Sequence, residues 1–313
     1  MSQFVRKARV RALAKINLDL RVLARRPDGY HELRTIFQTV SLADTIEISF
    51  AAGRGTSIEL DDSANIPNNL VERAARLAME AMGARGNVRM RLEKQIPMGA
   101  GLGGGSSDAA AVLLALPVLA GHALHTARLL ELAEQLGSDV SFFLLGGCAV
   151  GIGRGNELFP LPERPSVPGL LVTPGIHVST PEAYGLLSPR LTSESAQNKM
   201  VYFQLQAWNQ AFETVGINDF EGAVFERHKS LAVLKKRLIR AGAFVAMMTG
   251  SGSALFGLFG TRDEVNHAIA LLREEKTFRI SLVNRARYRA IWWQALKAHI
   301  DGRVWPPRSR YLR

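Results

Sequence analysis

The sequence predicts an α+β protein with two domains. Its 313 residues, 47% of them hydrophobic, can form a full core and exceed the usual size of one domain. Segments with strand and helix periodicity both occur, but without the regular alternation of a doubly wound sheet. The segment 160–168 has four prolines in nine positions and marks the expected domain junction. We therefore expect one domain over residues 1–165 and a second over 166–313.

The first expected element is a strand over residues 10–22. Its even positions are apolar or alanine, whereas its odd positions are mostly polar, with Leu13 the exception. This period of two is typical of a half-buried strand. Lys15 and Asn17 are therefore expected to share one face.

Turn and helix signals order the segments that follow. A Pro-Asp-Gly turn in residues 25–33 leads into a strand over 35–50. Apolar residues with helical spacing over 70–82 predict a helix that stops at Gly83. A strand over 87–97 comes next.

Two helices complete the N-terminal half. An alanine-rich helix is expected over 106–116, where Pro117 should end it. Another is expected over 126–136, with Thr126 as its N-cap and Gly137 as its stop.

The C-terminal half mixes both kinds of element. In chain order we expect a strand at 169–175, helices near 181–187, 199–214 and 230–241, a glycine turn at 249–253, a helix at 263–275 and a strand at 278–288.

Composition restricts the compartment. The longest apolar stretch, 142–153, is too short to span a membrane and contains four glycines. The N-terminus has basic residues but lacks the apolar region of an export signal, so we expect a cytoplasmic protein with no membrane partner. The single cysteine, Cys148, cannot form an internal disulfide, and its apolar surroundings predict an inert thiol. The seven histidines show no zinc-like spacing.

The net charge of +11 indicates an anionic partner, either nucleic acid or a phosphate-bearing metabolite. Residues 285–313 have eight Lys or Arg, one acid and five aromatic residues, a mixture that suits single-stranded nucleic acid. The alternative is a solvated edge strand followed by a helix and a tail. We favour this alternative because the charge is spread along the segment.

Five glycines occupy the seven positions from Gly99 to Gly105, just before the alanine-rich helix. Without Cβ atoms, peptide N–H groups can approach a ligand, and a helix N-terminus adds partial positive charge. The stretch therefore predicts a phosphate site. It is not a Walker loop, because no Lys-Ser/Thr pair follows the last glycine, and it lacks the acid of a dinucleotide site.

The segment PMGAGLGGGSSDAA (97–110) resembles the second motif of the GHMP kinases. Five further segments follow the family's order: AKINLDL (14–20), RRPDGYHEL (25–33), QLGSDVSFFL (135–144), NDFE (218–221) and MTGSGSALFGLF (248–259). The resemblance implies a two-domain α+β fold with the active site in the cleft between the domains. It also implies ATP as the phosphoryl donor.

The pairing of AKINL with DGYHEL is more particular than the glycine motif. It implies that the acceptor is the 2-hydroxyl of cytidine diphosphate-linked methylerythritol, in non-mevalonate isoprenoid precursor biosynthesis. Two other functions stay open. One is a small-molecule kinase of the homoserine or mevalonate type, against which the DGYH segment argues. The other is a nucleic-acid-binding protein that uses the basic C-terminus. The tail beyond about residue 297 departs from the family.

The resemblance assigns catalysis to Lys15 and Asp139. Alone, Lys15 is an ordinary strand lysine and Asp139 a first-turn acid that complements a helix dipole. Within the family pattern, Lys15 lies near the transferring phosphoryl group and Asp139 is the base for the acceptor hydroxyl. A carboxylate at a helix start is acidic, so it should orient the hydroxyl and accept its proton late.

The resemblance also implies acceptor-binding residues. They are Asn17, Tyr30, His31, Thr180 and Tyr184. Tyr30 and Tyr184 are expected to stack on cytosine, His31 to read its edge, and Asn17 and Thr180 to hold the methylerythritol.

The expected ATP site centres on the glycine-rich segment. Its residues are Asn69 and Lys94 near the adenosine, and Pro97, Met98, Gly99, Ala100, Gly101, Leu102, Gly103, Gly104, Gly105, Ser106 and Ser107 around the phosphates. Mg²⁺ is expected to accompany ATP, with Ser107 as the nearest hydroxyl.

Overall fold

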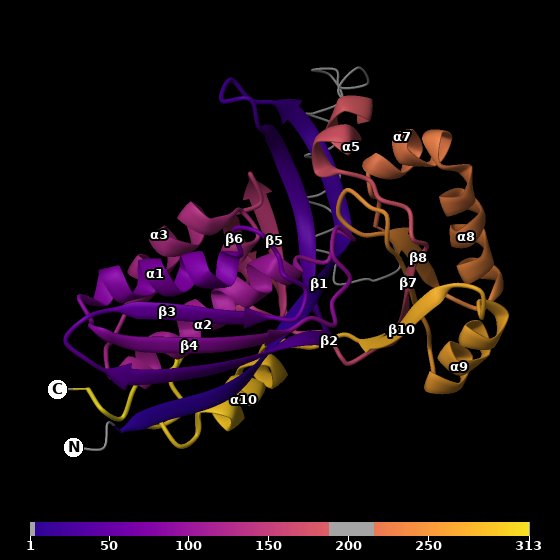
Figure 1. The fold of residues 1–313 in the computed structure, drawn as a ribbon. Coiled ribbons are helices and arrows are strands. Elements are labelled where there is room, and N and C mark those ends of the chain that lie inside the picture. The colour runs from indigo at the N-terminus through magenta and orange to yellow at the C-terminus, as the bar shows by residue number, and fades with distance from the viewer. Residues whose placement is uncertain (1–3, 188–215, 313) are drawn as a thin grey trace.

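The computed structural model describes residues 4–187 and 216–312. These residues form two β-sheets with helices packed against them, which confirms the α+β class (Figure 1). The helix expected at 199–214 lies outside the described residues. Within the described ranges, every helix is too short or too polar to cross a membrane.

A six-stranded sheet forms the N-terminal part of the fold. Its strands are β1 (Val5–Arg25), β2 (His31–Ala52), β3 (Ser57–Asp62), β4 (Gly86–Glu93), β5 (Cys148–Gly153) and β6 (Glu157–Pro160). β1 and β2 form a long antiparallel hairpin. The other edge of β2 pairs with β5 near its start and with β4 near its end.

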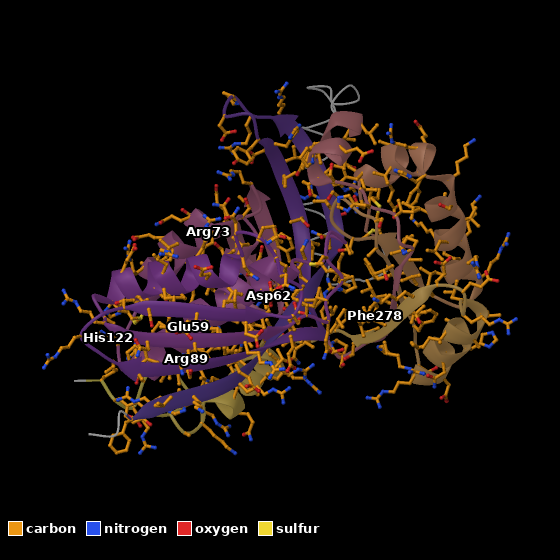
Figure 2. All side chains as sticks on the ribbon, viewed as in Figure 1. Glu59, Asp62, Arg73, Arg89, His122 and Phe278 are labelled. Atoms are coloured by element: carbon orange, nitrogen blue, oxygen red, sulfur yellow. The ribbon has the colours of Figure 1, made fainter. Side chains whose placement is uncertain are left out.

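Helices cover one face of this sheet (Figure 1). They are α1 (Leu70–Met82), α2 (Gly104–Ala120), α3 (Thr126–Leu136) and α4 (Val140–Leu145). The opposite face carries charged side chains such as Glu59 and Arg89, which form an ion pair at 3.0 Å across β3 and β4 (Figure 2). The alternation along β4 thus separates a buried apolar face from a solvated one.

Helix α2 is longer at both ends than the sequence predicts. It begins after Gly103, whose φ of 68° places it in the left-handed region, so the expected start at 106 is wrong. It also continues through Pro117 to Ala120, with Gly121 as its C-cap. Proline removes one helical hydrogen bond, but every residue from 107 to 119 is buried, so packing outweighs that local cost.

The other helix boundaries follow the sequence more closely. The Asn69 side chain accepts a hydrogen bond from the Val71 N–H and caps α1, which ends at Gly83 as predicted. Helix α3 begins at Thr126, but its N-cap is His125. No side chain in the described ranges caps α3, so the expected Thr126 cap is wrong.

The second sheet has four antiparallel strands in the order β10-β7-β9-β8. Its strands are β7 (Pro168–Thr173), β8 (Val245–Met248), β9 (Leu255–Leu258) and β10 (Lys276–Ser281). The helices of this half are α5 (Thr180–Leu187), α7 (Phe220–Arg227), α8 (Lys229–Arg240) and α9 (Arg262–Leu271). Phe278, labelled in Figure 2, lies on β10.

The β1–β2 hairpin passes through both halves of the molecule. Leu13 packs in the core of the first sheet, whereas Leu20 and Leu33 pack with the second core. Ile16 belongs to a third apolar cluster between them. Residues 12–20 are consequently buried on both faces, so the half-buried strand predicted from alternation is wrong over this stretch.

The C-terminal segment returns to the first domain. Helix α10 (Arg285–Leu296) places Tyr288 and Trp292 in the core of the first sheet. The residues of α10 fall within the expected second domain, 166–313, but they pack in the first core.

The strand expected at 278–288 is also shorter than predicted. It ends at Ser281, because the Asn284 side chain accepts from the Arg287 N–H and starts α10.

Candidate active site

A cavity of about 490 Å³ opens where the hairpin, the glycine-rich loop and the second domain meet. Its lining confirms that several segments distant in the sequence come together. The expected site residues that line it are Lys15, Asn17, Lys94, Pro97, Met98, Gly99, Ala100, Gly101, Leu102, Gly103, Gly104, Gly105, Ser106, Asp139, Thr180 and Tyr184.

The two glycine turns of the sequence touch each other at this cavity. A Cβ on Gly101 would lie 2.2 Å from the Thr249 carbonyl oxygen, and one on Gly250 would lie 2.9 Å from the Gly101 Cα. Both glycines also have positive φ, 76° and 58°. The Leu102 carbonyl accepts from the Lys15 N–H at 3.0 Å. The loop backbone is therefore fixed between the second turn and β1.

Lys15 and Asp139 meet on the wall of the cavity. Lys15 Nζ lies 3.4 Å from Asp139 Oδ2 and donates to Asn17 Oδ1 at 2.8 Å. The Lys15 side chain is only 5% exposed, whereas that of Asp139 is 32% exposed. Asp139 is the residue before α4, and its carboxylate makes no capping bond within the described residues. An ammonium group and an accessible carboxylate are thus held side by side.

Asn17 orients this pair. As the alternation predicts, it shares a face with Lys15, and its Oδ1 also accepts from the Gly250 N–H at 3.0 Å. Its Nδ2 donates to Thr35 Oγ1 at 2.7 Å. The amide therefore connects β1, β2 and the second glycine turn.

Aromatic side chains also line or border the cavity. The His31 ring stacks on the Tyr184 ring at a centroid distance of 4.3 Å. Tyr30 is 51% exposed, and the Arg154 guanidinium lies 3.6 Å above its ring centroid. Thr180 Oγ1 lies 3.1 Å from Ser251 Oγ. Of the expected cytosine readers, Tyr184 lines the cavity itself, whereas Tyr30 and His31 contact residues that line it.

Burial is the main cause that lowers the pKa of His31, and Arg25 adds to the effect. Burial likewise raises the pKa of the Tyr184 hydroxyl, with Asp139 as a second cause. Both groups are therefore neutral at pH 7.

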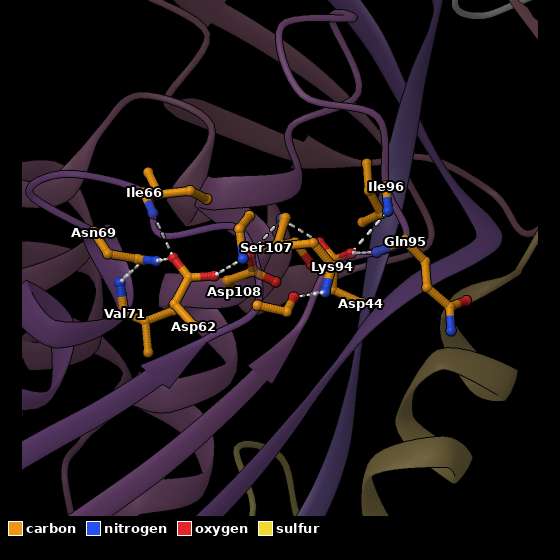
Figure 3. A network of polar contacts seen from close by, with 12 residues as sticks. Asp44, Asp62, Ile66, Asn69, Val71, Lys94, Gln95, Ile96, Ser107 and Asp108 are labelled. Atoms are coloured by element: carbon orange, nitrogen blue, oxygen red, sulfur yellow. Dashed lines mark hydrogen bonds and ion pairs between the residues drawn. The ribbon is translucent and has the colours of Figure 1, made fainter.

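Lys94 lies in a buried network of charges (Figure 3). Its ammonium donates to the carboxylates of Asp44 and Asp108, the latter at 2.7 Å. Asp44 also accepts from the backbone N–H groups of Gln95 and Ile96, at 2.5 and 2.8 Å. Burial acts to lower the pKa of Lys94, but Asp108 and Asp44 together raise it. The network fixes the segment that enters the glycine-rich loop.

Asn69 and Ser107 face the protein rather than the cavity. Asn69 Nδ2 donates to Asp62 at 2.8 Å, and its Oδ1 caps α1 (Figure 3). The Ser107 hydroxyl donates to the Leu13 carbonyl at 2.7 Å, and Ser106 lines the cavity instead. The described ranges contain no cluster of three or more His, Cys, Asp or Glu that could hold a metal.

Sequence reasoning missed several lining residues. They include Thr35, Phe37, Arg154, Gly155, Phe220 and Ser251. Ser251 lies in the second glycine turn, which the sequence did single out. The NDFE motif has a structural role in this turn. Asn218 Nδ2 donates to the carbonyls of Met248 and Gly250 and thereby holds the turn in place.

Two C-terminal aromatic residues, Tyr288 and Trp305, donate hydrogen bonds to backbone carbonyls of α4. Tyr288 is 2% exposed, and its hydroxyl donates to the Phe143 carbonyl at 2.5 Å. Trp305 Nε1 donates to the Leu144 carbonyl at 2.9 Å, and Trp292 is 2% exposed. Tyr288 and Trp292 cannot stack on nucleic-acid bases while they are buried here. The basic C-terminus instead supports the helix that follows Asp139.

The comparisons with known proteins identify the family. The sequence profile of the GHMP kinases N terminal domain matches residues 69–147, and that of GHMP kinases C terminal matches 202–276. A relative from Solibacter usitatus is 62% identical over 98% of this chain and 98% of its own length. The chain therefore belongs to the GHMP kinase family, which uses ATP as its phosphate donor, and it is a phosphotransferase.

The Solibacter relative is named 4-diphosphocytidyl-2-C-methyl-D-erythritol kinase. So is one from Pelotomaculum thermopropionicum, 41% identical over 84% of this chain and 92% of its own. A crystal structure of 4-(cytidine 5'-diphospho)-2C-methyl-D-erythritol kinase is 38% identical, with a TM-score of 0.73 over 88% of this chain and 98% of that one. Homoserine kinase from Cytophaga hutchinsonii, 18% identical with a TM-score of 0.70 over 89% of this chain and 95% of its own, shares the fold.

Proposed function

We propose that the protein transfers the γ-phosphoryl group of ATP to the 2-hydroxyl of 4-diphosphocytidyl-2-C-methyl-D-erythritol, a step in non-mevalonate isoprenoid precursor synthesis. The observation that carries the proposal is the 3.4 Å contact between Lys15 and Asp139 on the wall of a cavity that also holds the glycine-rich loop. The names of the relatives at 62% and 38% identity support this choice of acceptor.

The glycine-rich loop and the start of α2 hold the triphosphate. The loop exposes peptide N–H groups, and the 17-residue helix α2 directs its N-terminus toward the same place. Unpaired N–H groups and the helix dipole both favour bound phosphate. Gly99, Gly101 and Gly103 all have positive φ, which presents the loop backbone rather than side chains to the ligand.

Lys15 acts on the transferred phosphoryl group and Asp139 on the acceptor hydroxyl. Phosphoryl transfer requires in-line positioning and neutralisation of charge on the transferred group. The Lys15 ammonium supplies that neutralisation, because Asn17 holds it in one direction. The Asp139 carboxylate orients the acceptor hydroxyl and takes its proton as the new bond forms, after which the phosphorylated acceptor and ADP leave.

The aromatic residues at the cavity receive the cytosine. Tyr30, His31 and Tyr184 present ring faces and one ring edge there, and the neutral His31 can donate one hydrogen bond and accept another. Thr180 supplies a hydroxyl to the methylerythritol, and Asn17 supplies the remaining polar surface beside it.

Magnesium would enter together with ATP. When bound to the phosphates, it neutralises part of their charge. Magnesium takes oxygen ligands and needs only one or two from the protein when phosphates supply others. The Ser106 hydroxyl and the Asp139 carboxylate line the cavity and fit that requirement, whereas Ser107 donates to Leu13. With ATP as its donor, the enzyme would act in the cytoplasm.

A competition among acceptors tests the proposal. The protein is incubated with magnesium ATP and equal concentrations of the cytidine-linked methylerythritol, homoserine and mevalonate, and products are identified by phosphorus NMR and mass spectrometry. We expect phosphorylation of the cytidine-linked acceptor alone. Preferential phosphorylation of homoserine or mevalonate would overturn the choice of substrate and leave the family assignment intact.

A further inference from the structure

The C-terminal segment, residues 285–312, is bonded to the end of helix α4. It runs from β10 back alongside the first sheet (Figure 1). The last carbonyl groups of a helix have no N–H partner within the helix. In α4, the Phe143 carbonyl accepts from the Tyr288 hydroxyl at 2.5 Å. The Leu144 carbonyl accepts from Trp305 Nε1 at 2.9 Å. The C-terminal segment therefore supplies donors that this six-residue helix lacks.

The residues that follow α4 contact the same segment. Arg285 donates to the carbonyls of Gly146 and Cys148, at 3.2 and 2.6 Å. A Cβ on Gly146 would lie 2.3 Å from Tyr288 Cδ1, and one on Gly147 would lie 2.7 Å from Arg285 Cβ. Both glycines also have positive φ, 67° and 76°. The backbone at the end of α4 is therefore packed directly against the C-terminal segment.

The start of the same helix carries the carboxylate of the candidate site. Asp139 immediately precedes α4, and its Oδ2 lies 3.4 Å from Lys15 Nζ. Helix α4 also touches the glycine-rich loop, because a Cβ on Gly103 would lie 2.9 Å from Phe143 Cζ. At 1.5 Å per residue the helix is only about 9 Å long, so its two ends move together. Its orientation thus sets where Asp139 lies relative to Lys15.

We propose that Tyr288 and Trp305 are positioning residues for the phosphoryl transfer, which act through α4 to hold Asp139 at the acceptor hydroxyl. The inference rests on the role that the proposed function gives to Asp139. The Asp139 carboxylate makes no capping bond within the described residues, so its place depends on the helix and on Lys15. A shift of about 1 Å in a catalytic group can lower a rate on the order of 10²-fold.

The support comes from outside the matched family domains. Helix α4 lies within residues 69–147, which match the GHMP kinases N terminal domain. Tyr288 and Trp305 lie beyond both that range and the C-terminal match at 202–276. This chain therefore adds a fastening of its own to a helix that the family shares.

Trp305→Phe tests the proposal, because it removes the N–H donor and keeps an aromatic ring. We expect kcat to fall about 3- to 30-fold, with the KM values of ATP and of the acceptor unchanged. Tyr288→Phe removes the other donor and should act in the same direction. The matched control is Trp293→Phe. Trp293 Nε1 also donates to a carbonyl, at 3.3 Å, but this carbonyl belongs to Val304 in the C-terminal segment itself. The control should leave kcat unchanged.

A double-mutant comparison separates positioning from a general loss of structure. Trp305→Phe is introduced into wild type and into Asp139→Ala, and kcat is measured in all four proteins after circular dichroism confirms that they are folded. If Trp305 acts through Asp139, the substitution should have no further effect once the carboxylate is gone. Tyr288→Phe takes its place if Trp305→Phe does not fold.

Three results would overturn the inference. One is the same fractional loss of kcat in both backgrounds, which is the mark of a merely structural role. Another is wild-type kcat in both Trp305→Phe and Tyr288→Phe. The third is a loss confined to the KM of either substrate, which would mean that the segment shapes the binding surface. The proposed function is tested separately, because wild-type turnover in Asp139→Ala would remove the carboxylate from the mechanism whatever Trp305 does.

Discussion

The Lys15 ammonium lies 3.4 Å from the Asp139 carboxylate, and this contact joins the middle of β1 to the start of α4. We predict that Lys15→Met, which keeps the apolar stem and removes the charge, lowers kcat about 10²- to 10⁴-fold. Asp139→Asn should have an effect of the same order. Both are measured by ADP release, with Arg11→Met, exposed on the same strand, as the control. Turnover within threefold of wild type in either variant contradicts the assigned roles.

The contact between the two glycine turns predicts a steric cost. Gly101→Ala would place its Cβ 2.2 Å from the Thr249 carbonyl oxygen, whereas a Cβ on Gly175 meets nothing within 4 Å at a similar φ of 68°. Both variants suffer the strain of a left-handed backbone. Gly101→Ala should lose about 1 to 3 kcal/mol more unfolding free energy, because only it creates a clash. Urea unfolding measures the difference, and equal losses would show that the turns separate freely.

The Lys94 network predicts unequal effects of neighbouring substitutions. Lys94→Met would leave two buried carboxylates without a cation and should cost about 3 to 5 kcal/mol of unfolding free energy. Burial first, and Asp44 second, raise the pKa of Asp108, so Asp108→Asn should cost clearly less. Chemical denaturation at pH 7 compares the two. The prediction fails if Asp108→Asn is the more destabilising change.

Cys148 should be unreactive in the folded protein. It is 1% exposed, and burial raises the pKa of its thiol to about 11. The thiolate is the reactive form, so alkylation by iodoacetamide at pH 8 should be negligible in the native protein and complete in urea. Mass spectrometry counts the added groups. Rapid labelling without denaturant would show that this part of β5 opens readily.

His31 should make the free energy of unfolding depend on pH. Its folded pKa is lowered, mainly by burial, so the unfolded chain binds the proton more readily. Its contribution is therefore fully present above about pH 6.5, the unfolded value, and is lost as the pH falls through the lower, folded value. His31→Phe keeps an aromatic ring against Tyr184 and removes the titration. Between pH 7.5 and 5.5 the wild type should lose more unfolding free energy than this variant; parallel losses would exclude the effect.

Local sequence was sufficient to predict a structural feature when the residues that determine it lie within one segment. Helix α1 has regular apolar spacing and a glycine stop, and the period of two correctly placed Lys15 and Asn17 on one face. The resemblance covers most of the chain, so it could connect the expected ATP loop with Lys15 and Asp139. The structure brings these residues to one cavity.

Tertiary contacts determined the features that local sequence did not predict. Pro117 does not end α2, because burial of the surrounding helix outweighs one missing hydrogen bond. Lys94 appeared free to meet the nucleotide, since its sequence neighbours do not reveal that Asp44 and Asp108 neutralise it. Arg154 carried no signal, because an arginine in a hairpin turn is ordinary until the cavity beside it is known.

The β1–β2 hairpin, which pairs through both cores with three local shifts of register, restricts how this enzyme can move. A hinge that swung the domains apart would have to bend two hydrogen-bonded strands whose central residues are buried on both faces. We therefore expect the backbone around the cavity to keep its arrangement when substrates bind. Exposed side chains such as Tyr30, rather than closure of the two halves, should adjust to the substrate.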